Sequence, residues 1–171
     1  MYTKKGMTAI LCLVILGTLV ITGCGKKDNI NVKSGDNSIA EGYYFKDKET
    51  MIIMNSEADK ILSELGEYNK FTKVPSCAYQ GNDKIYSYNG YNIYTNEFDK
   101  KDVITSVILT SDLVSTPEGL KIGDSELKAD DIYGDNYKEE AGVRTYKKAD
   151  TELKIIIEKD AVTSIEYYAI R

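Results

Sequence analysis

The stretch KDVITSV at residues 101–107 returns almost unchanged as KDAVTSI at residues 159–165. Both copies are rich in Val, Ile and Thr, whose branched side chains favour β-strands. Each copy comes last in a similar series of predicted elements, so the pair indicates an internal tandem repeat. We expect the two units to cover about 50–112 and 118–171.

The first unit begins with a short helix. Apolar residues recur at the spacing of one helix face over residues 58–65, which predicts an amphipathic helix there. Gly66 ends it, and Ser56 with Asp59 matches a capping box at its start. The polar segment 67–76, which contains a proline, is expected to be a loop.

The period then changes from helical to alternating. Asn89-Gly90 is the strongest short signal for a two-residue hairpin turn, and it joins predicted strands at 84–88 and 91–97. A third strand is expected over 103–110. The first unit is therefore a helix followed by a three-stranded antiparallel meander.

The second unit follows the same order. Its helix is expected over 125–133, with Asp124 or Ser125 as the N-cap and Gly134 at the end. Its three strands are expected at residues 142–147, 151–158 and 161–170. The predicted fold class is α+β, a tandem repeat of a short helix followed by an antiparallel three-stranded meander, with the helices packed on one face of the sheet.

This order of elements resembles a known fold. A helix that ends at glycine, then a meander, repeated in tandem, resembles the β-lactamase inhibitor protein fold, and one unit resembles the small lipoprotein of the outer-membrane assembly complex. The phrase EGLKIGDS at residues 118–125, leading to Tyr133-Gly134, is similar to the strand-to-helix entry of that superfamily. The resemblance implies an inhibitor-like or protein-binding module, and it assigns no contact residue.

The N-terminus has the pattern of an export signal. Lys4 and Lys5 precede an apolar run over residues 7–21, which is too short to span a bilayer comfortably, because a spanning helix needs about 20 residues. The run ends in Ile21-Thr22-Gly23-Cys24, which resembles the lipobox of bacterial lipoproteins, although Leu and then Ala or Ser are more usual at the first two positions. The alternatives are an ordinary secretory signal with a chance cysteine and an uncleaved anchor.

The lipobox resemblance implies cleavage before Cys24 and a diacylglycerol on its sulfur, with a further acyl chain such as palmitate. Two or more chains give stable membrane anchoring. The whole chain also resembles small lipoproteins of Gram-positive bacteria. The expected organisation is a signal peptide at 1–23, the lipidated cysteine and a polar tether at 24–41, and a single α+β domain at 42–171.

Composition excludes several function classes. The formal charge is −5 (22 basic minus 27 acidic residues), and loss of two signal lysines makes it −7. This charge disfavours nucleic acid and anionic lipid surfaces as partners. The chain has no histidine, which removes His-dependent triads and common zinc sites. We expect no cofactor and no metal.

Two further groups of residues allow only weak functional readings. Cys77 has no expected disulfide partner, because Cys12 would leave with the signal peptide and Cys24 would carry the lipid. We expect Cys77 to be a small buried residue. Tyr86, Tyr88 and Tyr91 share one face of the hairpin, where core packing is favoured over a carbohydrate platform.

The candidate binding surface is the sheet face opposite the helices. The expected core face carries alternate residues of the two last strands: Val103, Thr105, Val107, Leu109, Thr163, Ile165, Tyr167 and Ala169. The opposite face carries apolar residues where a solvated sheet would be polar: Tyr94, Ile104, Ile108, Ile156 and Tyr168. These five form a candidate protein-binding patch, unless residues 43–54 cover them or they are scattered surface residues.

The sequence therefore predicts a membrane-anchored, extracytoplasmic lipoprotein. Its expected role is a non-enzymatic module that binds an envelope or secreted protein, with no nucleic-acid partner. The alternative is a small envelope hydrolase that uses paired carboxylates, which would need two acids close together in a cleft, one of them with a raised pKa.

Overall fold

The structure is a computed structural model, and it describes residues 41–171. Ten strands and two helices follow one another in these residues. Their bounds are β1 Tyr44–Asp47, β2 Thr50–Ile53, α1 Ala58–Leu65, β3 Lys70–Pro75, β4 Asn82–Tyr88, β5 Tyr91–Phe98, β6 Lys101–Leu109, α2 Glu126–Tyr133, β7 Lys138–Glu140, β8 Val143–Lys148, β9 Thr151–Glu158 and β10 Ala161–Ala169.

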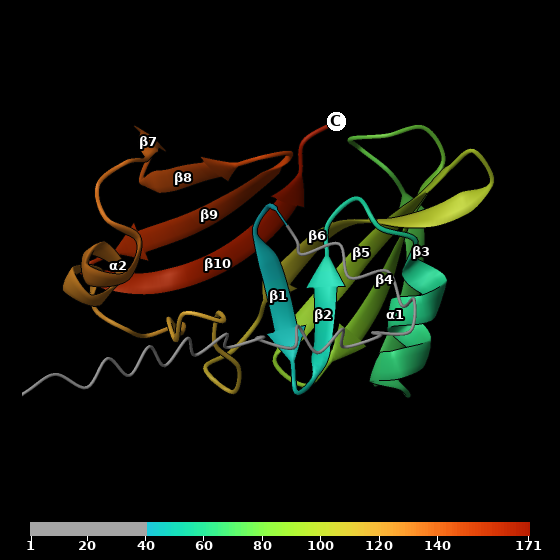
Figure 1. Cartoon of the computed structure of the whole chain (residues 1–171), viewed down its shortest axis with the longest axis horizontal. Coiled ribbons are helices and arrows are strands. Elements are labelled where there is room, and N and C mark those ends of the chain that lie inside the picture. Colours follow the sequence, from blue (N-terminus) through green and yellow to red (C-terminus); the bar gives the residue numbers. More distant parts are fainter. Residues whose placement is uncertain (1–40) are drawn as a thin grey trace, which may run out of the picture. The chain divides into compact units, whose positions relative to one another are not determined.

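The fold is built on one eight-stranded antiparallel sheet in the order β3-β4-β5-β6-β10-β9-β8-β7 (Figure 1). Each half of the chain supplies a helix and then a meander of four strands. The last strands of the two halves, β6 and β10, pair with each other at the centre. This pairing joins both meanders into one sheet and leaves β3 and β7 as its edges.

The predicted fold class is therefore wrong. The described chain is mostly β, and its two helices are eight residues each, so it is not a helix layer on three-stranded meanders. The missing strands are β3, in a segment expected to be a loop, and β7. Both are edge strands, and each pairs on one side only, β3 with β4 and β7 with β8.

A second small sheet covers the middle of one face. The hairpin of β1 and β2 pairs Phe45 with Ile52, and both side chains are fully buried. The ring of Phe45 lies 4.8 Å from that of Tyr91 and 6.1 Å from that of Tyr167. We call this covered side of the large sheet the first face and the other side the second face.

The two repeated stretches, residues 101–107 and 159–165, have the same local structure. In the first, Ser106 pairs with Tyr94 but Ile104 pairs with Thr95, which leaves Thr105 as a β-bulge. In the second, Thr163 is the corresponding unpaired residue. Each bulged threonine donates its hydroxyl to the carbonyl of the residue facing the next serine, at 3.2 Å for Thr105 and 3.3 Å for Thr163.

These bulges change which side chains enter the core. One extra residue reverses the alternation of a strand, so Ile104 and Val162 join Val107 and Ile165 in the core. The unbroken period of two had also predicted Val103, Thr105 and Thr163 there. Val103 and Thr105 are buried but lie outside this core cluster, and Thr163 is exposed, so its assignment is wrong. The remaining expected core residues lie in the core or pack against it: Val107, Leu109, Ile165, Tyr167 and Ala169.

Local sequence signals predicted turns and helix ends more accurately than they predicted the fold class. The Asn89-Gly90 turn is confirmed, with Tyr88 paired to Tyr91 across it. Helix α1 occupies the expected residues, but its N-cap is Glu57 without a side-chain hydrogen bond, and the Ser56 hydroxyl donates to the carbonyl of Ile53 at 2.6 Å. The capping box is therefore wrong. Ser125 is confirmed as the N-cap of α2.

Candidate functional site

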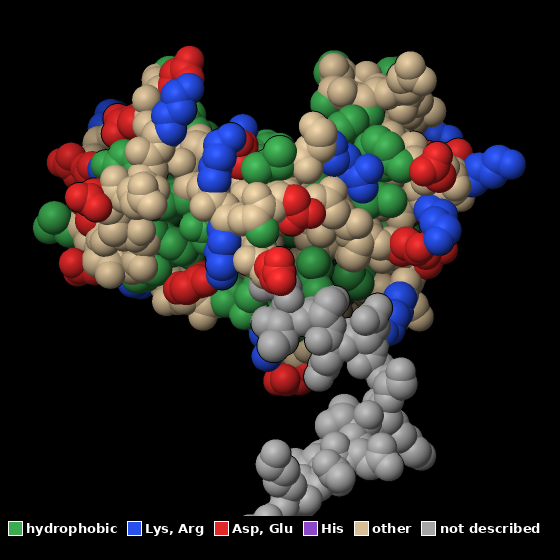
Figure 2. Space-filling model, turned by 45° about the horizontal axis from the view of Figure 1, so that its top comes forward, with side chains coloured by type: hydrophobic (Ala, Val, Ile, Leu, Met, Phe, Trp, Pro, Cys, Tyr) green, Lys and Arg blue, Asp and Glu red, His purple; other side chains and the backbone are tan. Residues whose placement is uncertain are grey.

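The second face of the sheet is the first place to look for a binding surface. Within residues 41–171, the β1–β2 hairpin packs on the first face, with Phe45 and Ile52 in the core. The alternative that residues 43–54 cover the second face is therefore wrong. Figure 2 shows hydrophobic surface in patches between acidic and basic side chains on the side it presents, with no single continuous apolar face.

A hollow on the second face is formed by a row of three residues across three strands. Ser106 of β6 pairs with Tyr94 of β5 on one side and with Tyr168 of β10 on the other. A serine between two tyrosines leaves a gap, because its side chain is much shorter than its neighbours. We call the resulting cavity of about 220 Å³ the tyrosine hollow.

Other elements complete the walls of the tyrosine hollow. Ile108 lies two residues along β6 from Ser106, and Ala78 and Tyr79 come from the connection between β3 and β4. The ring of Tyr79 meets that of Phe98 edge-on at 5.2 Å. The Arg171 guanidinium lies 3.9 Å from the centre of the same Phe98 ring. The connection is therefore tied to the end of the sheet beside the hollow.

Tyr168, one wall of the hollow, is held by hydrogen-bonding and charged neighbours. The Tyr168 hydroxyl donates to Glu166 at 2.8 Å, and the Ser164 hydroxyl donates to the other oxygen of the same carboxylate at 2.8 Å. Burial, followed by the contact with Glu166, raises the pKa of Tyr168. The Lys154 ammonium lies 4.6 Å above the Tyr168 ring. These contacts hold the ring in place as a fixed wall.

Three of the five predicted patch residues line the tyrosine hollow: Tyr94, Ile108 and Tyr168. Ile104 is 0% exposed and belongs to the core. Ile156 is half-buried on β9 opposite Ser164, four residues from Tyr168 along the ladder, which is about 13 Å. The structure thus keeps three of the predicted patch residues. It adds five others to the lining of the hollow: Ala78, Tyr79, Asp83, Thr105 and Ser106.

The other candidate groups of the sequence analysis do not form a site. Cys77 is exposed, not buried as expected. Within residues 41–171, no group of three metal-ligating side chains comes together. In the described part of the chain, two carboxyls have a clearly shifted pKa. Both pKa values are lowered, that of Asp124 by Lys128 and that of Glu152 by Lys147. A general acid needs the opposite shift, so no observation favours the hydrolase alternative.

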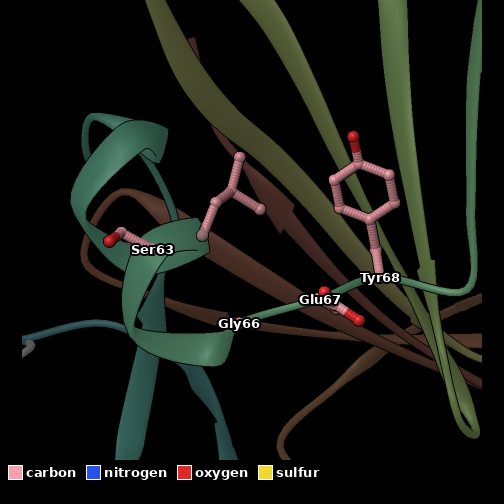
Figure 3. Close-up of a pocket in the computed structure, with 5 residues that line it drawn as sticks. Ser63, Gly66, Glu67 and Tyr68 are labelled. Atoms are coloured by element: carbon pink, nitrogen blue, oxygen red, sulfur yellow. The ribbon is translucent and has the colours of Figure 1, made fainter.

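A second hollow of about 510 Å³ lies beside the C-terminal end of α1, lined by Leu62, Ser63, Gly66, Glu67 and Tyr68. Figure 3 shows the Tyr68 ring standing between the helix and the strands, while the Ser63 hydroxyl points away from it. Small-molecule sites have polar groups that converge on the ligand. Because these do not converge, this hollow has the character of an apolar surface depression.

Exposed apolar residues near the β3 edge of the sheet were not among the predicted patch residues. Tyr68, Phe71 and Val74 are 45%, 44% and 37% exposed, and two of them belong to β3. Tyr68 and Phe71 pack around Tyr86 with ring distances of 5.3 and 5.1 Å. The aromatic and β-branched residues Phe71, Thr72 and Val74, which favour strands, were the available signal for β3.

No helix within residues 41–171 is long and apolar enough to cross a membrane. No family model matches the chain, and no curated protein or solved structure is significantly similar to it.

Proposed function

We propose that this protein is a membrane-anchored extracytoplasmic lipoprotein that binds another envelope or secreted protein through the tyrosine hollow. The observation that carries the proposal is the row Tyr94–Ser106–Tyr168 on a sheet face away from the β1–β2 hairpin. Protein interfaces are anchored by side chains that enter preformed pockets, often beside tyrosines.

The size of the hollow favours a protein partner over a free small molecule. Ligand pockets usually have volumes of about 300 to 1,000 Å³, and the tyrosine hollow has about 220 Å³. It suits one large apolar side chain from a partner, enclosed by two rings and by Ile108. Asp83 of the lining, together with Glu166 and Lys154 beside Tyr168, would supply the polar groups that usually surround the core of an interface.

Substituting Tyr94, Ile108 and Tyr168 together with serine is expected to reduce partner capture at least about tenfold, because anchor residues cost more than about 1.4 kcal/mol when truncated. The measurement is a crosslinked pull-down from the native cell envelope with the full-length protein as bait. Serine at Met51, Leu113 and Leu127, which are exposed elsewhere, provides the matched control and should capture the partner normally. Undiminished capture by the hollow variant would show that the hollow is not the contact surface.

The membrane anchor rests on the N-terminal sequence alone, because Cys24 lies outside the described residues. We expect Cys24→Ala to move the protein out of the membrane fraction or to stop its maturation, since the lipobox then lacks the thiol that would carry the lipid. Cys12→Ala is the matched control and should leave fractionation unchanged. Membrane recovery of the Cys24 variant equal to that of the wild type would refute lipidation.

A further inference from the structure

The two edges of the large sheet differ in how they are protected. β7 has three residues, all exposed and charged, Lys-Glu-Glu, and short charged edges resist pairing with other strands. β3 has six residues, and its side away from β4 pairs with no strand within residues 41–171. It also carries the exposed Phe71 and Val74. β3 is therefore the edge that is long enough to accept another strand.

The direction of the main chain of β3 suits strand addition. Across the β3–β4 connection, the Ser76 N–H donates to the Gly81 carbonyl at 3.0 Å. In an antiparallel ladder, residues alternate between those bonded to the neighbouring strand and those whose N–H and C=O point away. Ser76 bonds toward β4, so every second residue before it does the same in this register. The residues between them, including Phe71 and Lys73, direct their N–H groups away from β4. Pro75 ends this edge because it has no N–H.

The charges on β3 select the kind of strand that could be added. Lys73 lies directly opposite Lys84 in the ladder, and like charges facing each other are unfavourable. Lys84 is neutralised by Asp102, at 2.6 and 2.8 Å from its two carboxylate oxygens. Lys70 and Lys73 form no ion pair within residues 41–171. A carboxylate on the open side of Lys73 would supply the missing countercharge.

The same lysines disfavour a second copy of this strand. If two β3 edges paired, exposed lysines from both copies would come together, which is one way in which edge strands avoid self-association. An acidic strand converts that repulsion into attraction, so the charge pattern discriminates between partners.

We propose that β3 binds an extended acidic peptide segment of a partner protein by β-strand addition. Lys70 and Lys73 are three residues apart, so the segment carries two carboxylates separated by two residues. The residue that faces Phe71 is apolar and packs on its ring. This site is separate from the tyrosine hollow and does not depend on the proposed function.

A synthetic peptide that repeats Thr-Val-Glu provides this carboxylate spacing, and the same peptide with lysine in place of glutamate is the counterpart. Binding to the full-length protein in detergent is followed by fluorescence anisotropy. We expect the glutamate peptide to bind at least tenfold more tightly than the lysine peptide. The double variant Lys70→Glu/Lys73→Glu should reverse this preference. Equal binding of both peptides, or binding of neither, would overturn the proposal.

A second pair of variants tests the main-chain bonds. Lys73→Gln keeps the outward N–H and removes the charge, while Lys73→Pro removes both. Proline is tolerated where an edge N–H faces solvent, so the β3–β4 ladder should survive. We expect Lys73→Pro to bind the glutamate peptide at least fivefold more weakly than Lys73→Gln. Equal affinities would show that the peptide is held by charge alone and would overturn strand addition. The serine variant of the tyrosine hollow should bind the peptide normally.

Discussion

Ile104→Ser is expected to destabilise the fold by about 4 kcal/mol, because it leaves a cavity and buries a hydroxyl without a designed partner. Ile104 is 0% exposed. Its main chain also fixes the start of α1, accepting from the Asn55 N–H at 2.9 Å and donating to the Ser56 carbonyl at 3.0 Å. Urea unfolding followed by circular dichroism measures the loss of stability. We expect a lower midpoint urea concentration and an unchanged dependence of the unfolding free energy on urea.

Ile108→Ser is the matched control for this prediction. Both residues are isoleucines of β6, but Ile108 is half-buried on the second face beside the tyrosine hollow. We expect it to cost about 1 kcal/mol, as for a partly exposed apolar residue. Equal destabilisation by the two serines would mean that the bulge at Thr105 does not turn Ile104 into the core.

Arg144→Met is expected to cost about 2 to 3 kcal/mol. The Arg144 residue is 6% exposed, and its guanidinium donates to Asp130 at 2.7 Å and to Glu126. Both acids belong to α2, so this arginine of β8 attaches the helix to the sheet. It also lies 4.7 Å from the centre of the Tyr137 ring. The methionine leaves two carboxylates without their countercharge, which lowers the free energy of unfolding. Their partial exposure to water limits this effect.

The Arg144 prediction has two controls. Lys147→Met removes an ion pair with Glu152 that spans 2.8 Å, but this lysine side chain is 63% exposed, so the cost should stay below about 1 kcal/mol. Adding Glu126→Gln and Asp130→Asn to Arg144→Met should recover part of the stability, because the unpaired charges are then gone. Thermal unfolding of the three variants measures these differences. No recovery would show that the arginine acts through packing alone.

Local sequence signals predicted the elements that depend on neighbouring residues. The Asn89-Gly90 hairpin and helix α1 lie at the expected residues, because turn chemistry and a 3.6-residue period act over a few positions. The same reasoning found three residues of the tyrosine hollow, since simple alternation holds around Tyr94, Ile108 and Tyr168. It could not find Tyr79, whose position depends on the β3–β4 connection.

By itself, the sequence determined the repeated strand, the hairpin, both helices and the N-terminal pattern that leads us to propose lipid attachment at Cys24. Tertiary structure alone decided that β6 and β10 join two meanders into one sheet, that β3 becomes an edge strand, and that the β1–β2 hairpin covers the first face. It also decided that Ile104 faces the core. The physical reason is that strand pairing is made between distant residues, and one bulge at Thr105 reverses a period that local alternation assumes to be unbroken.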